Sequence, residues 1–316
     1  MKIDVILGAG LTAREIRELG VLAERYGIHT FWNQSFPACR DPLLTMAAGL
    51  VGATRTIKLG TLPVSPYEVH PQRIADSILT FNELAGGRAA ILIGGLGHSV
   101  MRVTGLDSKQ RVASVRDCVT ILKSMGPDEM LHYQGPRYST MNYQPQWATQ
   151  TPPLIYVGAS GPNMLRMSAE IADGIMMSDI PLGRMPEVLA SVAGGLKKNQ
   201  HSQEQFRLNN FFAWHVKEDA QESYREARRE LVWRGFLKQW YTEPFLGADN
   251  ASLVEDNKDV FLQAFFQGSD HIAGIPDEIV NDLVANLTAF VDHLRAMKPP
   301  QAKGAFIRRV SVSTTM

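Results

Sequence analysis

Short runs of β-branched and other apolar residues alternate along this chain with amphipathic helical segments. Such an alternation is typical of βα units arranged around a parallel sheet, so it favours the α/β class. At 316 residues the chain is long enough for one large α/β domain or for two smaller ones. The predicted strands are Ile3–Leu7, Ile28–Trp32, Ile57–Thr61, Arg88–Gly94, Leu154–Val157, Gly174–Met177 and Asn209–Val216.

Capping signals mark where several of the helices begin. Thr12 and Glu15 have the spacing of a capping box, and Gly27 supplies the stop. Asp41-Pro42 predicts an N-cap with proline at the first helical position, opening a helix to about Ala53. His70-Pro71 opens another helix, in which His70 is expected to be a cap or packing residue rather than a catalyst. Further helices are expected over Ser108–Met125 and Arg184–Asn199.

Seven strand–helix alternations without a linker of disordered composition favour a single (β/α)8 TIM barrel over a doubly wound sheet. We therefore expect residues 1–316 to form one domain with insertions. After helices around Leu253–Phe266 and Pro276–Met297, only Ala305–Val312 is left for the eighth strand. Because a regular barrel would carry one more helix, the C-terminus is expected to be shortened.

The charge balance and the cysteine content exclude several classes of function. The chain has 32 basic and 32 acidic residues, so no overall field draws it to nucleic acid or to an anionic membrane. Cys39 and Cys118 are too few for a disulfide framework and lack metal-ligand spacing. The first apolar run is too short for a signal peptide. We therefore expect a soluble, cytoplasmic protein without a metal site.

The segment Leu154–Pro162 joins an apolar strand to a turn of small residues and then to a proline suited to begin a helix. With no long side chains in the turn, a phosphate could approach the backbone N–H groups closely, at the positive end of the helix dipole. The alternative is an ordinary strand–loop–helix connection. The turn residues are Gly158, Ala159, Ser160 and Gly161.

Four motifs lie in an order and spacing that resemble the bacterial-luciferase-like superfamily of flavin- and deazaflavin-dependent oxidoreductases. The segment Ile91–Gly97 resembles most the methylenetetrahydromethanopterin reductases and their bacterial relatives, which use the deazaflavin coenzyme F420. Beyond about residue 220 the resemblance is poor. The motifs are Arg40–Pro42 with Ala53–Gly60, Pro66–Pro71, Glu83–Arg88, and Val157–Pro162 with Ala169–Gly174.

The resemblance implies an enzyme that holds its tricyclic cofactor at the C-terminal mouth of the barrel, with the phosphate on the turn at Gly158–Gly161. It also implies that the end of the third strand bulges against one face of the ring. In deazaflavin-dependent relatives this bulge is associated with a cis peptide bond, so we expect a cis Leu62-Pro63 bond, which proline makes less costly. The implied cofactor-binding residues are Leu62, Pro63, Val64, Gly94, Gly95, Gly158, Ala159, Ser160 and Gly161.

One departure from the family bears on mechanism. Family members commonly have an Asp-His pair where this chain has Ser35 and Phe36, neither of which is a neutral-pH acid or base. We name His98, after the fourth strand, and Asn33, at the end of the second, as catalytic candidates. Asn33 and its neighbour Gln34 also offer donors and acceptors to a ring edge. The alternatives are an exposed loop histidine for His98 and a satisfied turn for Asn33 and Gln34.

These observations predict an oxidoreductase that transfers a hydride between the deazaflavin coenzyme and a small organic substrate. The alternatives are a monooxygenase that uses reduced FMN and a catalytically idle flavin-binding or cofactor-free paralogue. The resemblance also implies a homodimer through the helices after strands two and three, where Leu43–Val51 is unusually small and apolar. An ion pair between Glu83 and Arg88 is expected to fix the loop before the fourth strand.

Overall fold

The computed structural model describes residues 2–8, 10–36, 39–97, 101, 104–107, 109–178, 180, 182–198, 206–211, 217–223, 242–243 and 247–256. The chain divides into two compact units, 1–212 and 213–315. The first unit holds the sheet and the predicted cofactor-binding residues. In the second, α10 (Ala248–Asp256) is the longest element that the structure describes. No helix of the described ranges is long and apolar enough to cross a membrane.

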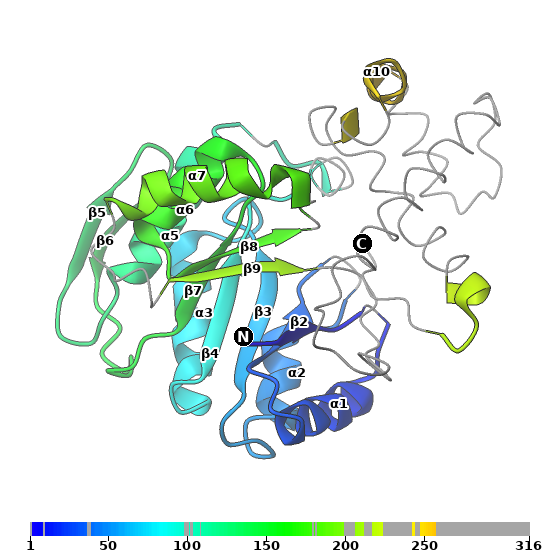
Figure 1. The fold of residues 1–316 in the computed structure, drawn as a ribbon. Coiled ribbons are helices and arrows are strands. Elements are labelled where there is room, and N and C mark those ends of the chain that lie inside the picture. The colour runs from blue at the N-terminus through cyan, green and yellow to red at the C-terminus, as the bar shows by residue number, and fades with distance from the viewer. Residues whose placement is uncertain are drawn as a thin grey trace. The chain divides into compact units, whose positions relative to one another are not determined.

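A seven-stranded parallel sheet forms the centre of the first unit, and its strands are neighbours in the order in which they occur along the chain (Figure 1). All seven predicted strands are present, although β2 and β9 are displaced from their predicted bounds. Between β4 and β7 the chain inserts the separate hairpin β5–β6. The strands of the sheet are β1 (Asp4–Ile6), β2 (Thr30–Gln34), β3 (Lys58–Val64), β4 (Ala89–Ile93), β7 (Leu154–Gly158), β8 (Gly174–Ser178) and β9 (Arg207–Phe211).

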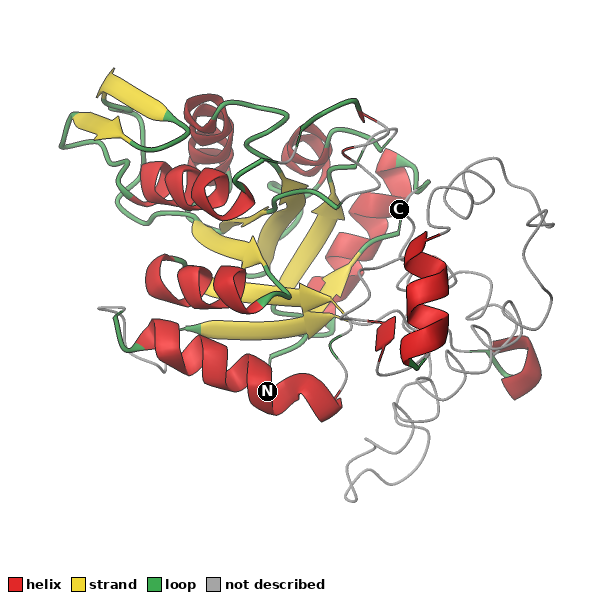
Figure 2. Cartoon of the chain, turned by 90° about the horizontal axis from the view of Figure 1, so that it is seen from above, coloured by secondary structure: helices red, strands yellow, loops and turns green. Residues whose placement is uncertain are grey.

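The sheet is curled, so that strands distant in the order meet across its inner face (Figure 2). The Trp32 ring on β2 meets the Tyr156 ring on β7 edge to face, with centroids 5.3 Å apart. The Asn209 amide on β9 donates to Asp4 Oδ2 on β1 at 2.7 Å, which links the two edge strands. The sheet therefore confirms the α/β class and a barrel-like curvature. The eighth strand predicted at Ala305–Val312 lies outside the described residues, so the complete (β/α)8 barrel stays a prediction.

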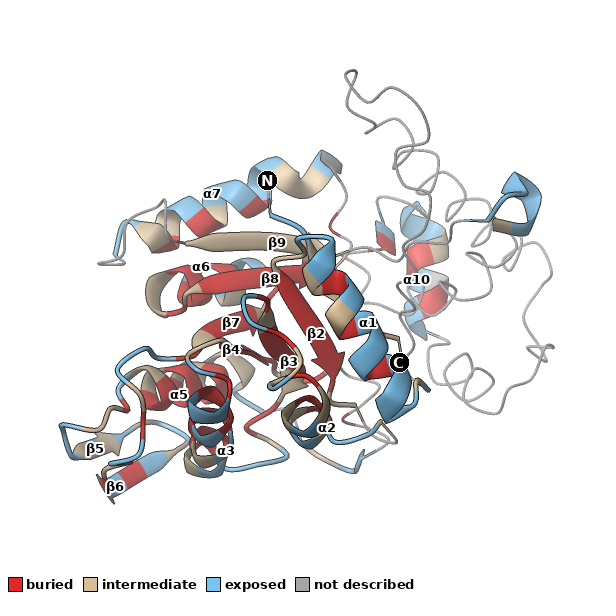
Figure 3. Cartoon of the chain, turned by 90° about the horizontal axis from the view of Figure 1, so that it is seen from below, coloured by how far each residue is buried: buried red, intermediate tan, exposed pale blue. Residues whose placement is uncertain are grey.

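Helices cover the outer face of the sheet, and the strands between them are largely buried (Figure 3). Three predicted N-termini are confirmed: Thr12 and Glu15 form both bonds of a capping box, Asp41 accepts from Leu44 N, and His70 accepts from Gln72 N. Pro162 also begins its helix as predicted. The helices are α1 (Ala13–Arg25), α2 (Pro42–Gly49), α3 (Pro71–Leu84), α5 (Arg111–Lys123), α6 (Pro162–Ile171) and α7 (Met185–Leu196), preceded by a short 3-10 turn at Leu182–Arg184.

The hairpin of β5 (Leu131–Gln134) and β6 (Ser139–Tyr143) was not predicted from the sequence. It is organised by Asp117, a fully buried carboxylate on α5. Asp117 accepts from Tyr133 OH at 2.8 Å and from the backbone N–H groups of Arg137 and Tyr138 at 2.7 and 2.9 Å. Hydrogen bonds to a charged acceptor thus hold the tip of the hairpin against the body of the unit.

The expected ion pair between Glu83 and Arg88 is wrong. Arg88 Nη1 donates to Thr54 Oγ1 and to the carbonyl of Ile57, each at 3.0 Å, and its Nη2 donates to the carbonyl of Val51 at 3.2 Å. The guanidinium turns inward because several of its N–H groups find acceptors there. These hydrogen bonds stabilise the fold more than one exposed ion pair with Glu83 would.

Candidate active site

The C-terminal ends of the strands form the mouth of the curled sheet, and the end of β3 is irregular there. Thr61 pairs with Ile91 of β4, but the next pair is Val64 with Ile93, so β3 has one more residue than β4 in this interval. That arrangement is a β-bulge at Leu62 and Pro63. Two backbone bonds hold it: Ser35 N donates to the Leu62 carbonyl at 2.7 Å, and Gly94 N donates to the Val64 carbonyl at 2.9 Å.

The bulge confirms one expectation, and its backbone corrects another. No described peptide bond is cis, so the predicted cis Leu62-Pro63 bond is wrong. The shift in register creates the bulge with a trans bond. Proline suits this place because the ladder to β4 is interrupted there, and a missing N–H therefore leaves no pairing unmade.

Glycines at the end of β4 leave room for the neighbouring side chains. A Cβ atom at Gly94 would lie 3.1 Å from Pro63 Cβ, which is tighter than ordinary packing, so the bare backbone lets the bulge approach β4. A Cβ at Gly95 would lie 3.6 Å from Cδ of Arg111, at the start of α5. Gly94 therefore lies next to the bulge, and Gly95 lies next to Arg111.

The turn between β7 and α6 has the form that anion binding requires. Gly161 is the N-cap of α6 in an extended conformation, and no side chain caps this helix. Ala159 N donates to the Met176 carbonyl at 3.3 Å, whereas the N–H groups of Ser160 and Gly161 have no acceptor among the described residues. A Cβ built at Gly161 meets nothing within 4 Å, so the turn borders open space. Free N–H groups at a helix N-terminus are the donors that a phosphate needs.

Arg111 is a second feature of this region, and the sequence reasoning missed it. It is the first residue of α5, a helix without a side-chain cap, and its Nε is buried without a partner in the described part of the chain. Helix α5 lies beside α6, to which Arg116 and Glu170 join it by an ion pair of 3.0 Å. A buried guanidinium nitrogen without an acceptor is rare in native proteins, so Arg111 is a candidate anion ligand. Composition could not reveal it, because only burial distinguishes it from other arginines.

Two consecutive polar residues at the end of β2 have buried atoms without a partner among the described residues: Asn33 Nδ2 and Gln34 Oε1. Side chains alternate between the faces of a strand, so Gln34 shares the inner face with Trp32. Asn33 lies on the opposite, helix-facing side, in register with Thr61. The catalytic role of Asn33 stays a prediction, and its placement directs attention to Gln34.

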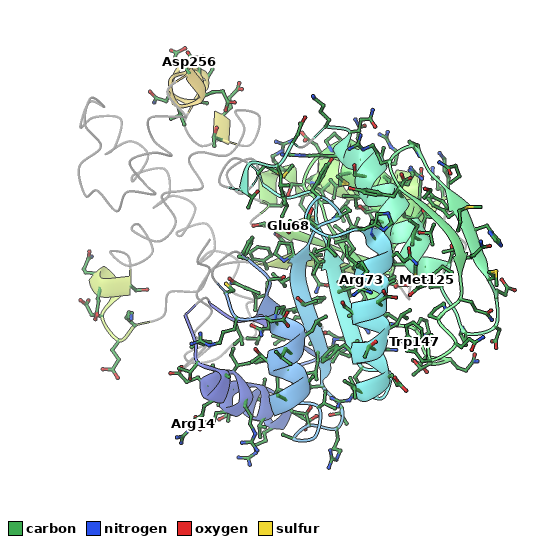
Figure 4. The ribbon with its side chains drawn as sticks, turned by 180° about the vertical axis from the view of Figure 1, so that it is seen from behind. Arg14, Glu68, Arg73, Met125, Trp147 and Asp256 are labelled. Carbon is green, nitrogen blue, oxygen red and sulfur yellow. The ribbon has the colours of Figure 1, made fainter. Side chains whose placement is uncertain are left out.

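Acid and base groups are sparse among the described residues of the mouth. Ser35 and Phe36 follow β2 as predicted, and His98 lies outside the described residues. Glu68 lies in the loop that follows β3 (Figure 4), where desolvation raises the pKa of its carboxyl. In the described part of the chain, no group of three or more His, Cys, Asp or Glu side chains could hold a metal ion.

The sequence profile of the family described as luciferase-like monooxygenase matches residues 1–292. The chain belongs to this family. Membership confirms the resemblance inferred from the four motifs and makes the protein an enzyme of the luciferase-like class.

Two curated relatives illustrate the similarity. The chain is 28% identical over 207 residues to 5,10-methylenetetrahydromethanopterin reductase from Archaeoglobus fulgidus. This match covers 66% of this chain and 62% of that protein. It is 28% identical over 201 residues to an F420-dependent glucose-6-phosphate dehydrogenase from Microbacterium testaceum, covering 58% of this chain and 59% of the relative. The matches thus span about three fifths of the length of these relatives.

Solved structures of two F420-dependent enzymes share the fold. The coenzyme F420-dependent tetrahydromethanopterin reductase from Methanopyrus kandleri superposes with a TM-score of 0.71 at 17% identity, covering 93% of this chain and 90% of that one. An F420-dependent secondary alcohol dehydrogenase gives a TM-score of 0.67 at 13% identity, covering 94% and 91%. At these identities the likeness shows the fold alone.

Proposed function

We propose that the protein is an oxidoreductase that transfers a hydride between the deazaflavin coenzyme F420 and a small organic substrate, on a barrel of the (β/α)8 type. The curated relatives named above include an F420-dependent dehydrogenase, and the similar solved structures include two F420-dependent enzymes. When bound, a deazaflavin supplies a ring carbon that gives or accepts a hydride.

The observation that carries the proposal is the uncapped turn at Ser160–Gly161, whose N–H groups have no acceptor among the described residues and whose open border fits a phosphate. Arg111 supplies a cation in the same region, on the helix next to α6. The bulge residues Leu62 and Pro63 offer an apolar support of the kind that a flat ring packs against. The residues present therefore fit a phosphorylated cofactor with an aromatic ring.

The residues that follow β2 limit the types of reaction that the site can catalyse. Neither Ser35 nor Phe36 exchanges a proton near neutral pH, so the residues after β2 can exclude water and orient a ligand but not serve as acid or base. This favours a hydride transfer with little proton demand at this place, because such a step depends mainly on orientation. His98 remains the proposed catalytic residue that could donate a proton. Asn33 remains a proposed site residue, but on the helix-facing side of β2 it would act by positioning the end of the strand.

A monooxygenase that uses reduced FMN is the second candidate. The family description itself favours it, and the oxygenating component of a Baeyer-Villiger monooxygenase in complex with FMN shares the fold with a TM-score of 0.55 at 16% identity. Both cofactors carry a phosphate and a tricyclic ring, so the turn and the bulge suit either.

The test is a titration of the purified protein with F420 and with FMN, followed by cofactor fluorescence. We expect F420 to bind more tightly than FMN, and Arg111→Met to weaken binding by about 10-fold or more, as for a lost hydrogen bond to a charged group. Arg73→Met, which removes an exposed arginine of α3 (Figure 4), is the matched control and should bind as the wild type does. Tighter binding of FMN would favour the monooxygenase. Binding of neither cofactor would reject both in favour of the idle paralogue.

A further inference from the structure

Gln34 is the last residue of β2 and faces the inside of the curled sheet, on the same side as Trp32. Only 4% of its surface is exposed, and its Oε1 atom has no hydrogen-bond partner among the residues that the structure describes. It is in register with Leu62 of the bulge. The bond from Ser35 N to the Leu62 carbonyl, 2.7 Å long, fixes the two strand ends to each other. The carboxamide is therefore held next to the surface that we propose supports the cofactor ring.

An unpartnered buried acceptor is costly, and native proteins keep few of them. Leucine would fill a similar volume at this position without that cost. A polar side chain retained in so apolar a place is explained if a ligand supplies the missing partner. Because the orphaned atom is an acceptor, the ligand atom facing it must be a donor.

We propose that Gln34 recognises the imide edge of a flavin or deazaflavin ring, where an N–H group lies beside a carbonyl. A carboxamide offers one acceptor and one donor group side by side, and so complements such an edge in either orientation of the amide. A phosphate or carboxylate offers acceptors only, so it would match the NH2 group of the carboxamide and leave its oxygen without a donor. This inference rests on the proposed function, and it assigns Gln34 a role in binding that is distinct from the phosphate turn.

Thr61 provides the matched control. Its side chain is fully buried, and its hydroxyl has no partner among the described residues either. Thr61 lies on the opposite face of its strand from Gly60, which packs under the Trp32 ring. Gln34 and Thr61 thus each carry a buried polar atom without a partner. They differ in that Gln34 faces the inside of the curled sheet and Thr61 faces the helices.

The experiment compares Gln34→Leu and Thr61→Val with the wild type in two measurements. The first is the dissociation constant for F420 and for FMN, by fluorescence titration. The second is the midpoint of thermal unfolding without cofactor. We expect Gln34→Leu to weaken binding about 5- to 10-fold and to raise the midpoint by about 2–4 °C. Thr61→Val is expected to leave binding unchanged. A purely structural role for Gln34 would instead lower the midpoint.

A modified ligand tests the atoms involved. FMN methylated at the imide nitrogen lacks the donor, so it should bind wild-type protein more weakly than FMN does and should bind Gln34→Leu about as well as FMN does. Equal affinity of wild type and Gln34→Leu for the cofactor would overturn the inference while leaving the proposed function intact. If wild-type protein binds neither cofactor, the proposed function fails, and this inference fails with it.

Discussion

Replacement of Glu24 by glutamine should destabilise the first unit to a degree that depends on pH. Glu24 lies near the end of α1, and one carboxylate oxygen accepts from the N–H groups of Arg55, Thr56 and Ile57 at 2.8, 2.7 and 3.0 Å. The Thr56 hydroxyl donates to the same oxygen at 3.1 Å. Burial alone would raise the pKa of the carboxyl, but these hydrogen bonds outweigh burial and lower the pKa from 4.5 to about 2.

The size of the effect follows from that pKa. A difference of about 2.5 between the unfolded and folded values corresponds to about 3 kcal/mol, which we reduce to about 2 kcal/mol because the partly exposed site is screened by solvent. Since the folded pKa is the lower one, the contribution is complete above about pH 4.5 and is lost as the pH falls toward 2. Glu24→Gln should therefore cost about 2 kcal/mol at pH 7 and much less at pH 3.

Urea unfolding followed by far-ultraviolet circular dichroism at pH 7, 5 and 3 measures this dependence. Glu18→Gln is the control: Glu18 lies on the same helix and forms an exposed pair with Arg14, so its loss should change stability little at any pH. An equal loss for Glu24→Gln at pH 7 and pH 3, or no loss at pH 7, would refute the reasoning.

Four further predictions address the site, the packing and the assembly. Gly161→Asp should weaken cofactor binding through charge repulsion, whereas Gly52→Asp at an exposed, open position should not; equal affinities in the fluorescence titration would remove the phosphate assignment. His98→Ala should slow turnover and leave coenzyme binding in place, and equal steady-state rates would make His98 an ordinary loop residue. Gly60→Ala should destabilise the unit by about 1–3 kcal/mol in urea, because a Cβ there overlaps the Trp32 ring. Light scattering at micromolar concentration should give the mass of a homodimer, and a monomeric mass would contradict the interface proposed for α2, where Leu44 is 70% exposed.

Local signals predicted the helix starts well, because the groups that form a cap lie within a few residues of each other. The Thr12–Glu15 capping box, the Asp41 cap and Pro162 at the start of α6 all formed as expected. The strands were recognised for a similar reason, since each is a short apolar run between helical segments. The turn at Gly158–Gly161 could be proposed because its small residues follow one another in the chain.

Features made by distant residues were not predicted. The β5–β6 hairpin depends on Asp117, a residue of the preceding helix. One local signal could have indicated the hairpin: Gly135-Pro136, between Tyr133 and Tyr138, is a dipeptide typical of turns. The environments of Arg111 and Gln34 become visible only when their burial is known. The cis bond was inferred from the family's bulge, and this chain forms the bulge by a shift in register instead.

The order of the strands has a consequence for how the chain acquires its fold during synthesis. Each strand of the seven-stranded sheet pairs with the previous strand of the same sheet. The sheet can therefore grow strand by strand as the chain leaves the ribosome. The bond from Asn209 to Asp4 joins residues 205 positions apart, and it can form only after β9 has been made. Before β9 is made, β8 is an edge strand and presents unpaired backbone groups to other nascent chains. A chain whose synthesis stalls before β9 lacks both the ladder between β8 and β9 and this bond, so we expect it to aggregate more readily than the finished protein.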